Sequence, residues 1–333
     1  MPEFRQNKAT KEWVVIAPAR GKRPSDFTKD VVKREPLPPH KADCPFCTGN
    51  EGMTPEPVYV MPNKENWKIR VVPNKFAALQ PGLAPTRTQV GSFLAAKGFG
   101  IAEVVVETTD HNKSIATMDL IEVAGVLKAY RVRHQEIAKD ENINLVTIFR
   151  NHGPRAGTSL EHPHSQIIAT PIVPPHVRYP IEQSVSYYDQ HGSCVYCDMV
   201  EEERRQRERI IIDSDNFVAF CPWSARSPFE IRIYPKRHMA SYIDINDDEI
   251  DELAWVLKNL LYKMYKCLDN PDYNYVLRSS PTGDEDARYL HWYFVIIPKI
   301  TTPAGFEIGS GIYINSVAPE DSAKFLRDTS TDC

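Results

Sequence analysis

The chain has 333 residues, of which 42% are hydrophobic and 25% charged, which fits two globular domains or one domain built from two halves. Its formal net charge of −4 disfavours a protein that binds nucleic acid through a basic surface. We expect a cytoplasmic protein, because the sequence shows no signal-peptide pattern and no run of 18 apolar residues that could cross a membrane.

The predicted elements alternate strands with two long helices. Residues 1–43 are rich in proline and basic side chains, so we expect extended segments and loops there and again at 51–67 and 79–92. Helices are predicted at 117–140 and 246–269, and the second begins with "NDDE", which suits a helix N-terminus. Strands are predicted at 102–109, 143–150, 164–171, 229–235, 273–280 and 291–298.

The order of these elements occurs twice along the chain. In the first half, "CPFC" is followed by "NKFAAL", a strand that ends in "TTDH", the first helix and the strand that carries "HPHSQII". In the second half, "CVYC" is followed by "DNFVAF", a strand that ends in "YPKRH", the second helix and the strand that carries "LHWYFVII". We therefore predict two copies of one α+β unit, in residues 1–180 and 181–333.

Each copy provides two cysteines and two histidines, which are the ligands that tetrahedral zinc prefers. The first predicted set is Cys44, Cys47, His111 and His162, and the second is Cys194, Cys197, His238 and His291. For either Cys-x-x-Cys taken alone, buried reduced cysteines or a redox pair are the alternatives. Because the same order occurs twice, we expect two zinc ions per chain, both structural because all four protein positions are filled.

His164 and Gln166 have no counterpart in the second half. When the ligand histidines of the two strands are aligned, Tyr293 takes the position of His164 and Val295 that of Gln166. A core histidine with satisfied hydrogen bonds is the alternative for a lone histidine. However, a neutral imidazole is a good nucleophile, and an amide donates a hydrogen bond to developing negative charge. We therefore predict that His164 and Gln166 carry the chemistry.

Two further motifs fit phosphate chemistry. The segment "NHGPRAGTS" at 151–159 contains two glycines that permit close approach of backbone N–H groups to a phosphate. In "PARGKRP", Arg20 and Arg23 offer guanidinium groups suited to fork-like phosphate contacts. Alone, each is an ordinary loop or basic patch, but together with His164 they indicate phosphoryl or nucleotidyl transfer. The run "EEERRQRER" at 201–209 is interpreted as a solvated helical face.

A family resemblance is carried by the motifs "PARGKRP", "CPFC", "VVPNKFAAL", "TTDH", "FRNHG", "SLEHPHSQ" and "GFEIGSGIYINSVAPEDSA". With them the chain resembles the galactose-1-phosphate uridylyltransferase family, a branch of the histidine-triad superfamily. The likeness is greater to compact members with Cys-x-x-Cys in both halves, a group that includes a plant ADP-glucose phosphorylase. It implies a duplicated histidine-triad-like α+β module, with mixed or antiparallel sheets that form half-barrels with packed helices. It also implies a homodimer whose sites combine both chains.

By this resemblance, His164 attacks the α-phosphorus of a nucleoside-diphosphate sugar and forms a nucleotidyl-histidine, and a sugar 1-phosphate or inorganic phosphate then accepts the nucleotide. Gln166 holds a phosphoryl oxygen. The family's substrate-binding positions map onto Arg20, Arg23, Asn74, Phe76, Asn151, Gly157, Ser159, Phe306 and Glu307. Lys75 departs from the family, which has an acidic residue there. Ser165 stands where well-known members have glycine and the plant-like group has serine.

The resemblance favours a UDP-glucose:hexose-1-phosphate uridylyltransferase with galactose 1-phosphate as acceptor. The alternative is an ADP-glucose:phosphate adenylyltransferase, and Ser165 favours that branch. A histidine-triad hydrolase is disfavoured because Gln166 replaces its third histidine. A zinc-containing module that binds nucleic acid is the distant alternative, and the acidic charge balance counts against it.

Overall fold

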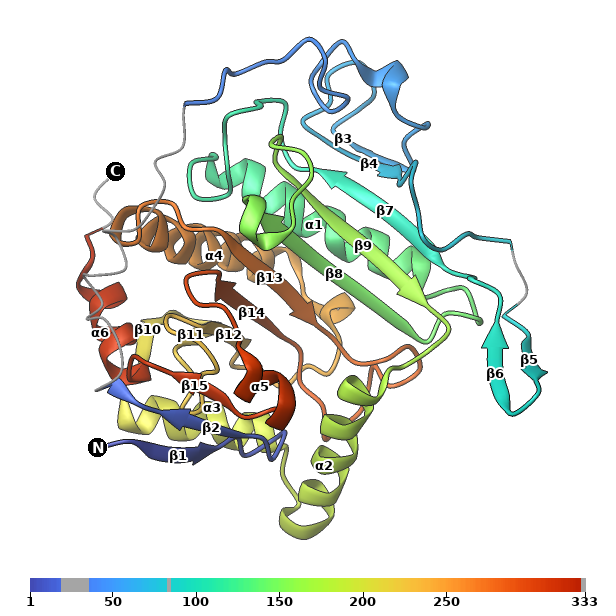
Figure 1. Cartoon of the computed structure of the whole chain (residues 1–333). Coiled ribbons are helices and arrows are strands. Elements are labelled where there is room, and N and C mark those ends of the chain that lie inside the picture. The colour runs from blue at the N-terminus through green and yellow to red at the C-terminus, as the bar shows by residue number, and fades with distance from the viewer. Residues whose placement is uncertain (19–35, 83–84, 331–333) are drawn as a thin grey trace.

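A long antiparallel sheet runs through the molecule and carries helices on both faces (Figure 1). The computed structural model describes residues 1–18, 36–82 and 85–330. The strands are β1 (Glu3–Gln6), β2 (Trp13–Ile16), β3 (Tyr59–Met61), β4 (Ile69–Pro73), β5 (Arg87–Val90), β6 (Phe93–Ala96), β7 (Ile101–Val106), β8 (Leu145–His152), β9 (His164–Thr170), β10 (Ile210–Asp213), β11 (Phe217–Phe220), β12 (Ile231–Pro235), β13 (Tyr273–Arg278), β14 (Tyr293–Pro298) and β15 (Tyr313–Asn315). The helices are α1 (Leu120–Ile137), α2 (Pro175–His191), α3 (Val195–Gln206), α4 (Asp247–Cys267), α5 (Gly305–Ser310) and α6 (Pro319–Asp328), with 3-10 turns η3 (Glu51–Met53), η4 (Pro154–Ala156) and η5 (Tyr242–Asp244).

The large sheet has ten strands in the order β10-β11-β12-β14-β13-β8-β9-β7-β4-β3, and every neighbouring pair is antiparallel. Strands of the first half form one five-strand set and strands of the second half form the other. Outward from the central pair β8–β13, the first set runs β8-β9-β7-β4-β3 and the second runs β13-β14-β12-β11-β10. Equivalent strands of the two halves therefore occupy equivalent places in the sheet. A smaller sheet, β1-β2-β15, is mixed because β2 and β15 are parallel. The expected α+β fold with antiparallel and mixed sheets is confirmed.

Helices α1 and α4 cover one face of the large sheet and contact each other (Figure 1). Their apolar side chains, such as Leu127 and Leu257, join the strands in one core. Helix α4 begins at a capping box in which Asn246 accepts the N–H of Glu249 and the Glu249 carboxylate accepts the N–H of Asn246. Both predicted helices are thus confirmed, with ends a few residues inside the predicted ones. None of the helices in the described ranges has the length and hydrophobicity needed to cross a bilayer.

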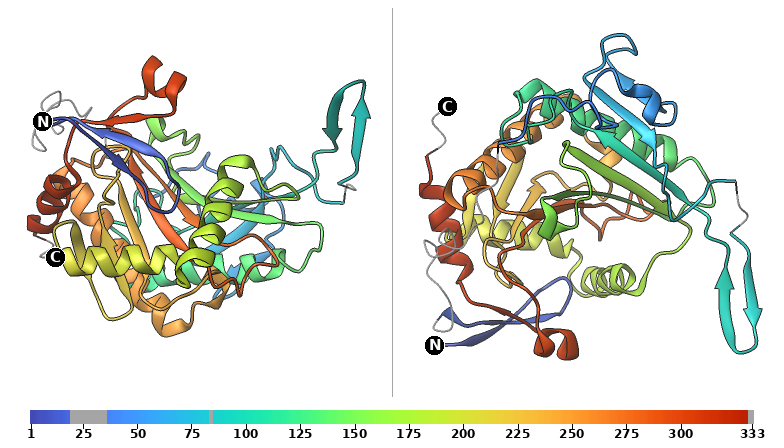
Figure 2. Two further views of the ribbon diagram at one scale, coloured as in Figure 1. Left: turned by 90° about the horizontal axis from the view of Figure 1, so that it is seen from below. Right: turned by 45° about the horizontal axis from the view of Figure 1, so that its top comes forward.

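The opposite face of the sheet lies behind β1, β2, β15, α2 and α5, as the rotated views also show (Figure 2). Several short strands were not predicted. Strands β1 and β2 fall in the segment 1–43, β3 in 51–67 and β5 in 79–92, all of which were expected to form extended segments or loops. Short strands such as these depend on a neighbouring strand more than on their own sequence. The hairpin β5–β6 projects from the body, and all of its residues are exposed (Figure 2).

The run 201–209 is only partly the predicted solvated face. Glu202 and Arg205 form an exposed ion pair on α3 at 2.6 Å. In contrast, Glu203 is 5% exposed and Arg209 only 2%, and they lie 2.8 Å apart. Burial raises the pKa of the Glu203 carboxyl to about 7, although the neighbouring guanidinium lowers it. Two of the nine side chains therefore belong to a buried ion pair, because they meet groups that come from distant parts of the sequence.

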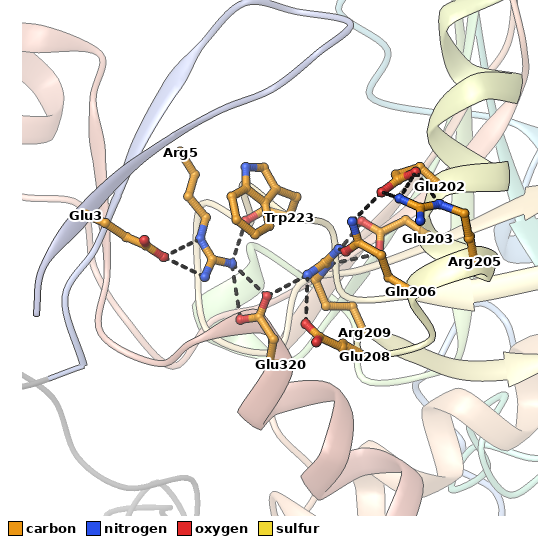
Figure 3. Close-up of polar contacts among 10 residues, drawn as sticks. All are labelled: Glu3, Arg5, Glu202, Glu203, Arg205, Gln206, Glu208, Arg209, Trp223 and Glu320. Carbon is orange, nitrogen blue, oxygen red and sulfur yellow. Dashed lines mark hydrogen bonds and ion pairs between the residues drawn. The ribbon is translucent and has the colours of Figure 1, made fainter.

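Glu320 of α6 connects this buried pair to the N-terminal strand (Figure 3). Its carboxylate lies 2.7 Å from Nη1 of Arg209 and 2.8 Å from Nη1 of Arg5. Both guanidinium groups lie over the ring of Trp223, 3.8 Å from its centroid for Arg5 and 5.0 Å for Arg209. The cluster therefore holds β1 and α6, from opposite ends of the chain, against the second half.

We predict that Glu320→Ala lowers the free energy of unfolding by about 2 kcal/mol, because two buried guanidinium groups lose their shared carboxylate, although Arg5 keeps Glu3 and Arg209 keeps Glu203 and Glu208 as acidic partners. Urea unfolding measures the effect. The control is Glu202→Ala, which removes a carboxylate from the exposed pair of the same cluster and changes stability far less. Equal losses in the two variants would contradict a buried clamp at Glu320.

Candidate active site and metal centres

Cys44, Cys47, His111 and His162 come together as one buried group, as the sequence predicts. Their ligand atoms all lie within 4.8 Å of one another. Sγ of Cys47 is 3.5 Å from Nδ1 of His111 and 3.6 Å from Nδ1 of His162. A tetrahedral zinc ion with ordinary Zn–S and Zn–N bonds separates such atoms by about 3.6 Å. These four side chains therefore fit one tetrahedral metal ion.

Contacts behind this group orient the histidine rings. Nε2 of His162 donates to the carbonyl of Thr108 at 2.9 Å, which leaves Nδ1 with the lone pair that a metal requires. Nε2 of His111 lies 3.7 Å from a carboxylate oxygen of Glu161. Burial lowers the pKa of His162 to about 4 and also lowers that of His111, so both rings are neutral at pH 7. Neutral rings in these orientations suit metal ligation.

In the second half, three of the four predicted ligands come together. The ligand atoms of Cys194, Cys197 and His238 lie within 4.8 Å of one another, and Sγ of Cys197 is 3.4 Å from Nδ1 of His238. The predicted fourth ligand, His291, is not part of this group, because its Nδ1 accepts the backbone N–H of Met239 at 3.3 Å. The second group is also more open, since Cys197 is half-buried and His238 exposed. It could hold a metal ion with three protein ligands.

His164 begins β9, two residues after the ligand His162. Its Nδ1 lies 2.9 Å from the carbonyl oxygen of His162, so Nδ1 carries the proton and Nε2 keeps a lone pair. Its ring lies 5.4 Å from the ring of Phe46. Burial lowers the pKa of His164, and the positive charge of Arg150 lowers it further, so the ring is neutral. A neutral imidazole with one free lone pair is a nucleophile.

The two faces of β9 differ in their surroundings. Ser165 and Ile167 are completely buried on the side of α1, whereas Gln166 is half-buried on the opposite side, the face to which His164 also belongs. Gln166 pairs with Phe149 of β8, two residues before Asn151. Asn151 therefore lies on the same face, beside the start of β9. Its Oδ1 accepts a hydrogen bond of 2.8 Å from Nδ2 of Asn274 on β13.

The loop before His162 carries two more of the predicted substrate residues. Gly157 ends η4 with a φ of 88°, a left-handed conformation that favours glycine. Gly157 and Ser159 are both exposed. Nδ2 of Asn274 also donates to the carbonyl of Ala156 at 2.9 Å, which fixes this loop next to β8. The loop and His164 are therefore neighbours.

Other predicted substrate residues lie farther from His164. The backbone N–H of Asn74 donates to the carbonyl of Ala102 at 2.9 Å, near the start of β7. His164 pairs with Val106 at the other end of that strand. Phe76 is 87% exposed in the loop that follows. Arg20 and Arg23 lie outside the described residues.

Phe306 and Glu307 belong to α5, which contacts β15 and lies over the second half of the sheet (Figure 1). The carboxylate of Glu307 accepts the N–H of Ala304 at 3.0 Å and so caps its own helix. Phe306 is 51% exposed. Within one chain, the structure does not bring this pair to the strand that carries His164. Their role at the sugar end stays a prediction.

A buried polar network that the sequence analysis missed lies on the opposite side of β9. The hydroxyl of Tyr130, on α1, lies 2.6 Å from Oγ of Ser165 and 2.6 Å from the hydroxyl of Tyr275. Next to it, a carboxylate oxygen of Glu107 is 2.9 Å from Nη1 of Arg150, and both residues are buried. Burial raises the pKa of Glu107, although Arg150 lowers it. The network holds β9 to α1 and β13 at the residue between His164 and Gln166.

We predict that a chelator removes the metal of the second group before that of the first, because the second has three ligands and is more exposed. The release of metal with time, followed with a colorimetric chelator, measures this order. We expect an early phase of release from the second group and a late phase from the first. Cys197→Ser should remove the early phase and Cys47→Ser the late phase, whereas Cys267→Ser, which lies outside both groups, should change neither. A single phase that both variants reduce equally would contradict two separate sites.

We predict that Tyr130→Phe lowers the free energy of unfolding by about 2 kcal/mol, because it leaves the buried hydroxyls of Ser165 and Tyr275 without a shared partner. Chemical denaturation measures the loss. Tyr59→Phe is the matched control, since Tyr59 also packs against α1 and no hydrogen bond of its hydroxyl is found within the described residues. If both substitutions cost the same, the network does not stabilise β9.

Comparisons with known proteins agree with this geometry over the whole chain. The N-terminal domain of galactose-1-phosphate uridyl transferase matches residues 1–174, and the C-terminal domain of the same family matches residues 180–310. An ADP-glucose phosphorylase of Arabidopsis thaliana is 37% identical over 335 residues, which cover 99% of this chain and 93% of that protein. The galactose-1-phosphate uridylyltransferase of Thermotoga maritima is 29% identical over 341 residues, which cover 100% of both proteins.

Solved structures show the same relationship. The crystal structure of an ADP-glucose phosphorylase from Arabidopsis thaliana with bound ADP-glucose superposes with a TM-score of 0.85 and 34% sequence identity, and covers 99% of this chain and 100% of that one. A structure described as a uridylyltransferase superposes with a TM-score of 0.77 and 28% identity, over 99% of this chain and 98% of that one. The chain therefore belongs to the galactose-1-phosphate uridylyltransferase family of nucleotidyltransferases.

Proposed function

We propose that this protein transfers the adenylyl group of ADP-glucose to inorganic phosphate through a covalent adenylyl-histidine. The observation that carries the proposal is the full-length similarity to an ADP-glucose phosphorylase at 37% identity, against 29% for a uridylyltransferase. Of the two readings that the sequence left open, this similarity supports the adenylyltransferase better than the UDP-glucose:hexose-1-phosphate uridylyltransferase. A related structure of similar fold binds ADP-glucose.

In the first step, Nε2 of His164 attacks the α-phosphorus of ADP-glucose. A P–N bond forms and the P–O bond to glucose 1-phosphate breaks, so that glucose 1-phosphate leaves and AMP stays on the ring. The ring gains positive charge in this step. Its Nδ1–H points at the carbonyl of His162 at 2.9 Å, and this carbonyl dipole stabilises the charge.

In the second step, an oxygen of inorganic phosphate attacks the same phosphorus. The P–N bond breaks, ADP leaves and His164 returns to its neutral form. The amide of Gln166, on the same face of β9, donates a hydrogen bond to a non-bridging phosphoryl oxygen in both steps. Because an amide neither accepts nor supplies a proton at neutral pH, it does not activate water against the intermediate.

We also propose that both Cys/His groups hold zinc, and that the zinc of the first group is structural because four protein ligands surround it. The distances of 3.5 and 3.6 Å from Cys47 to the two histidine nitrogens support this for the first group. His162, one of its ligands, lies two residues before His164, the first residue of β9. A metal bound to His162 would therefore hold the start of this strand and fix the direction of the His164 side chain. The homodimer stays a prediction. In such a dimer, Phe306 and Glu307 would lie at the sugar end of the site of the partner subunit.

The test is to incubate the protein with ADP-glucose or UDP-glucose without an acceptor and to search for added nucleotide by mass spectrometry. We expect AMP on His164 after ADP-glucose, and release of ADP when inorganic phosphate is added. His164→Asn should lose the adduct and at least about 1,000-fold in turnover.

The matched control is His191→Asn. The Nδ1 of His191 lies 2.9 Å from the carbonyl of Tyr187, the same local contact as in His164, but the residue ends α2 away from β9. It should keep full activity. Unchanged turnover in His164→Asn would refute the covalent mechanism. A UMP adduct that passes to galactose 1-phosphate, with none from ADP-glucose, would restore the uridylyltransferase reading.

A further inference from the structure

A cavity of about 220 Å³ lies on the open face of the second half of the sheet. Strands β13 and β14 form its floor. The turn between β1 and β2, the beginning of α2 and Tyr196 of α3 line its other sides. It is therefore enclosed by residues from four separate parts of the sequence, and its floor belongs to the half that lacks His164 and Gln166.

The register of the sheet makes this cavity the counterpart of the surface around His164. Val276 pairs with Val295 in the second half, as Phe149 pairs with Gln166 in the first. Two residues further along β13, Arg278 pairs with Tyr293, and Tyr293 occupies the place that His164 has in the first half. Arg278 occupies the corresponding place of Asn151. The two halves thus share the register of the sheet and differ in the side chains on its open face.

Three arginines line the cavity, and two of them have acidic partners. A guanidinium nitrogen of Arg226 contacts the carboxylate of Glu12, and Arg232 lies 3.1 Å from a carboxylate oxygen of Glu230. Arg278 is half-buried, and no ion pair of its guanidinium is found within the described ranges. The lining groups therefore leave one positive charge without a counter-ion inside a partly enclosed space, where an anion is attracted more strongly than in water.

A buried hydroxyl also lacks a partner at this cavity. Ser280, two residues after Arg278, is 6% exposed, and its Oγ makes no hydrogen bond with the described residues. A buried hydroxyl without a partner is unfavourable, so a ligand that accepts its hydrogen bond is stabilised. The uncompensated guanidinium and the free hydroxyl donor call for the same kind of ligand, an anion with several acceptor oxygens.

We propose that this cavity binds a phosphate dianion, either inorganic phosphate or the phosphomonoester group of a sugar phosphate, without reacting with it. Arg278 provides the charge and Ser280 a hydrogen bond. The cavity, of about 220 Å³, has room for a phosphate or a small sugar phosphate. Tyr293 and Val295 provide no nucleophile of the kind that His164 supplies.

Isothermal titration calorimetry without turnover tests the proposal, using inorganic phosphate, glucose 1-phosphate and, as a neutral comparison, glucose. We expect Arg278→Met to remove one phosphate or sugar phosphate site per chain, or to weaken it at least tenfold. Arg288→Met removes an exposed arginine outside the cavity and should keep every site. Equal affinities for phosphate and glucose 1-phosphate would assign recognition to the phosphate alone, whereas tighter glucose 1-phosphate would add contacts to the sugar.

Ser280→Ala is the second variant, since it removes only one oxygen, and it should weaken the same site several-fold. The thermal midpoint without ligand should not fall in the variants, and the adduct on His164 should still form. An unchanged number of sites and unchanged affinities in both Arg278→Met and Ser280→Ala would overturn the proposal. Equally tight binding of glucose would also overturn it. Neither result would alter the test of the adenylyl-histidine.

Discussion

The pairing of β8 with β13 is the interaction on which the rest of the structure depends. It joins two five-strand sets into one antiparallel sheet, so both halves share a core on the side of α1 and α4 and an open face on the other side. The same pair of strands also connects the surface around His164 with the cavity of the second half. Asn274 of β13 holds both Asn151 and the loop at Ala156, next to His164, while Arg278 of the same strand lines the cavity of the second half.

Strand β9 shows how one short segment serves several purposes. Its period of two sends Ser165 into the polar network beneath the sheet and His164 and Gln166 to the open face. Just before the strand, His162 joins the first Cys/His group. The start of β9 is therefore held by the network at Ser165 and by the Cys/His group at His162, and in the proposed mechanism this limits the freedom of the His164 ring when its Nε2 attacks phosphorus.

The two halves keep the same framework and differ in the side chains of the open face. In the first half that face carries an imidazole and an amide, which suit transfer of a nucleotidyl group. In the second half tyrosine and valine take these places, and three arginines line a cavity. Because both halves contribute side chains to one core, the fold needs the second half whichever side chains its open face carries.

The sequence by itself determined the family, the duplicated order of elements, the pairing of each Cys-x-x-Cys with distant histidines, and the distinction between His162 and His164. These follow from spacing and from the comparison of the two halves. It did not predict the short strands β1, β2 and β3, the buried pair of Glu203 and Arg209, or the network at Ser165. Only the tertiary structure decided that His291 stays out of the second group and that Arg278 lines a cavity. These features depend on which segments meet in space, and no local pattern records which partner a buried charge or a short strand will find.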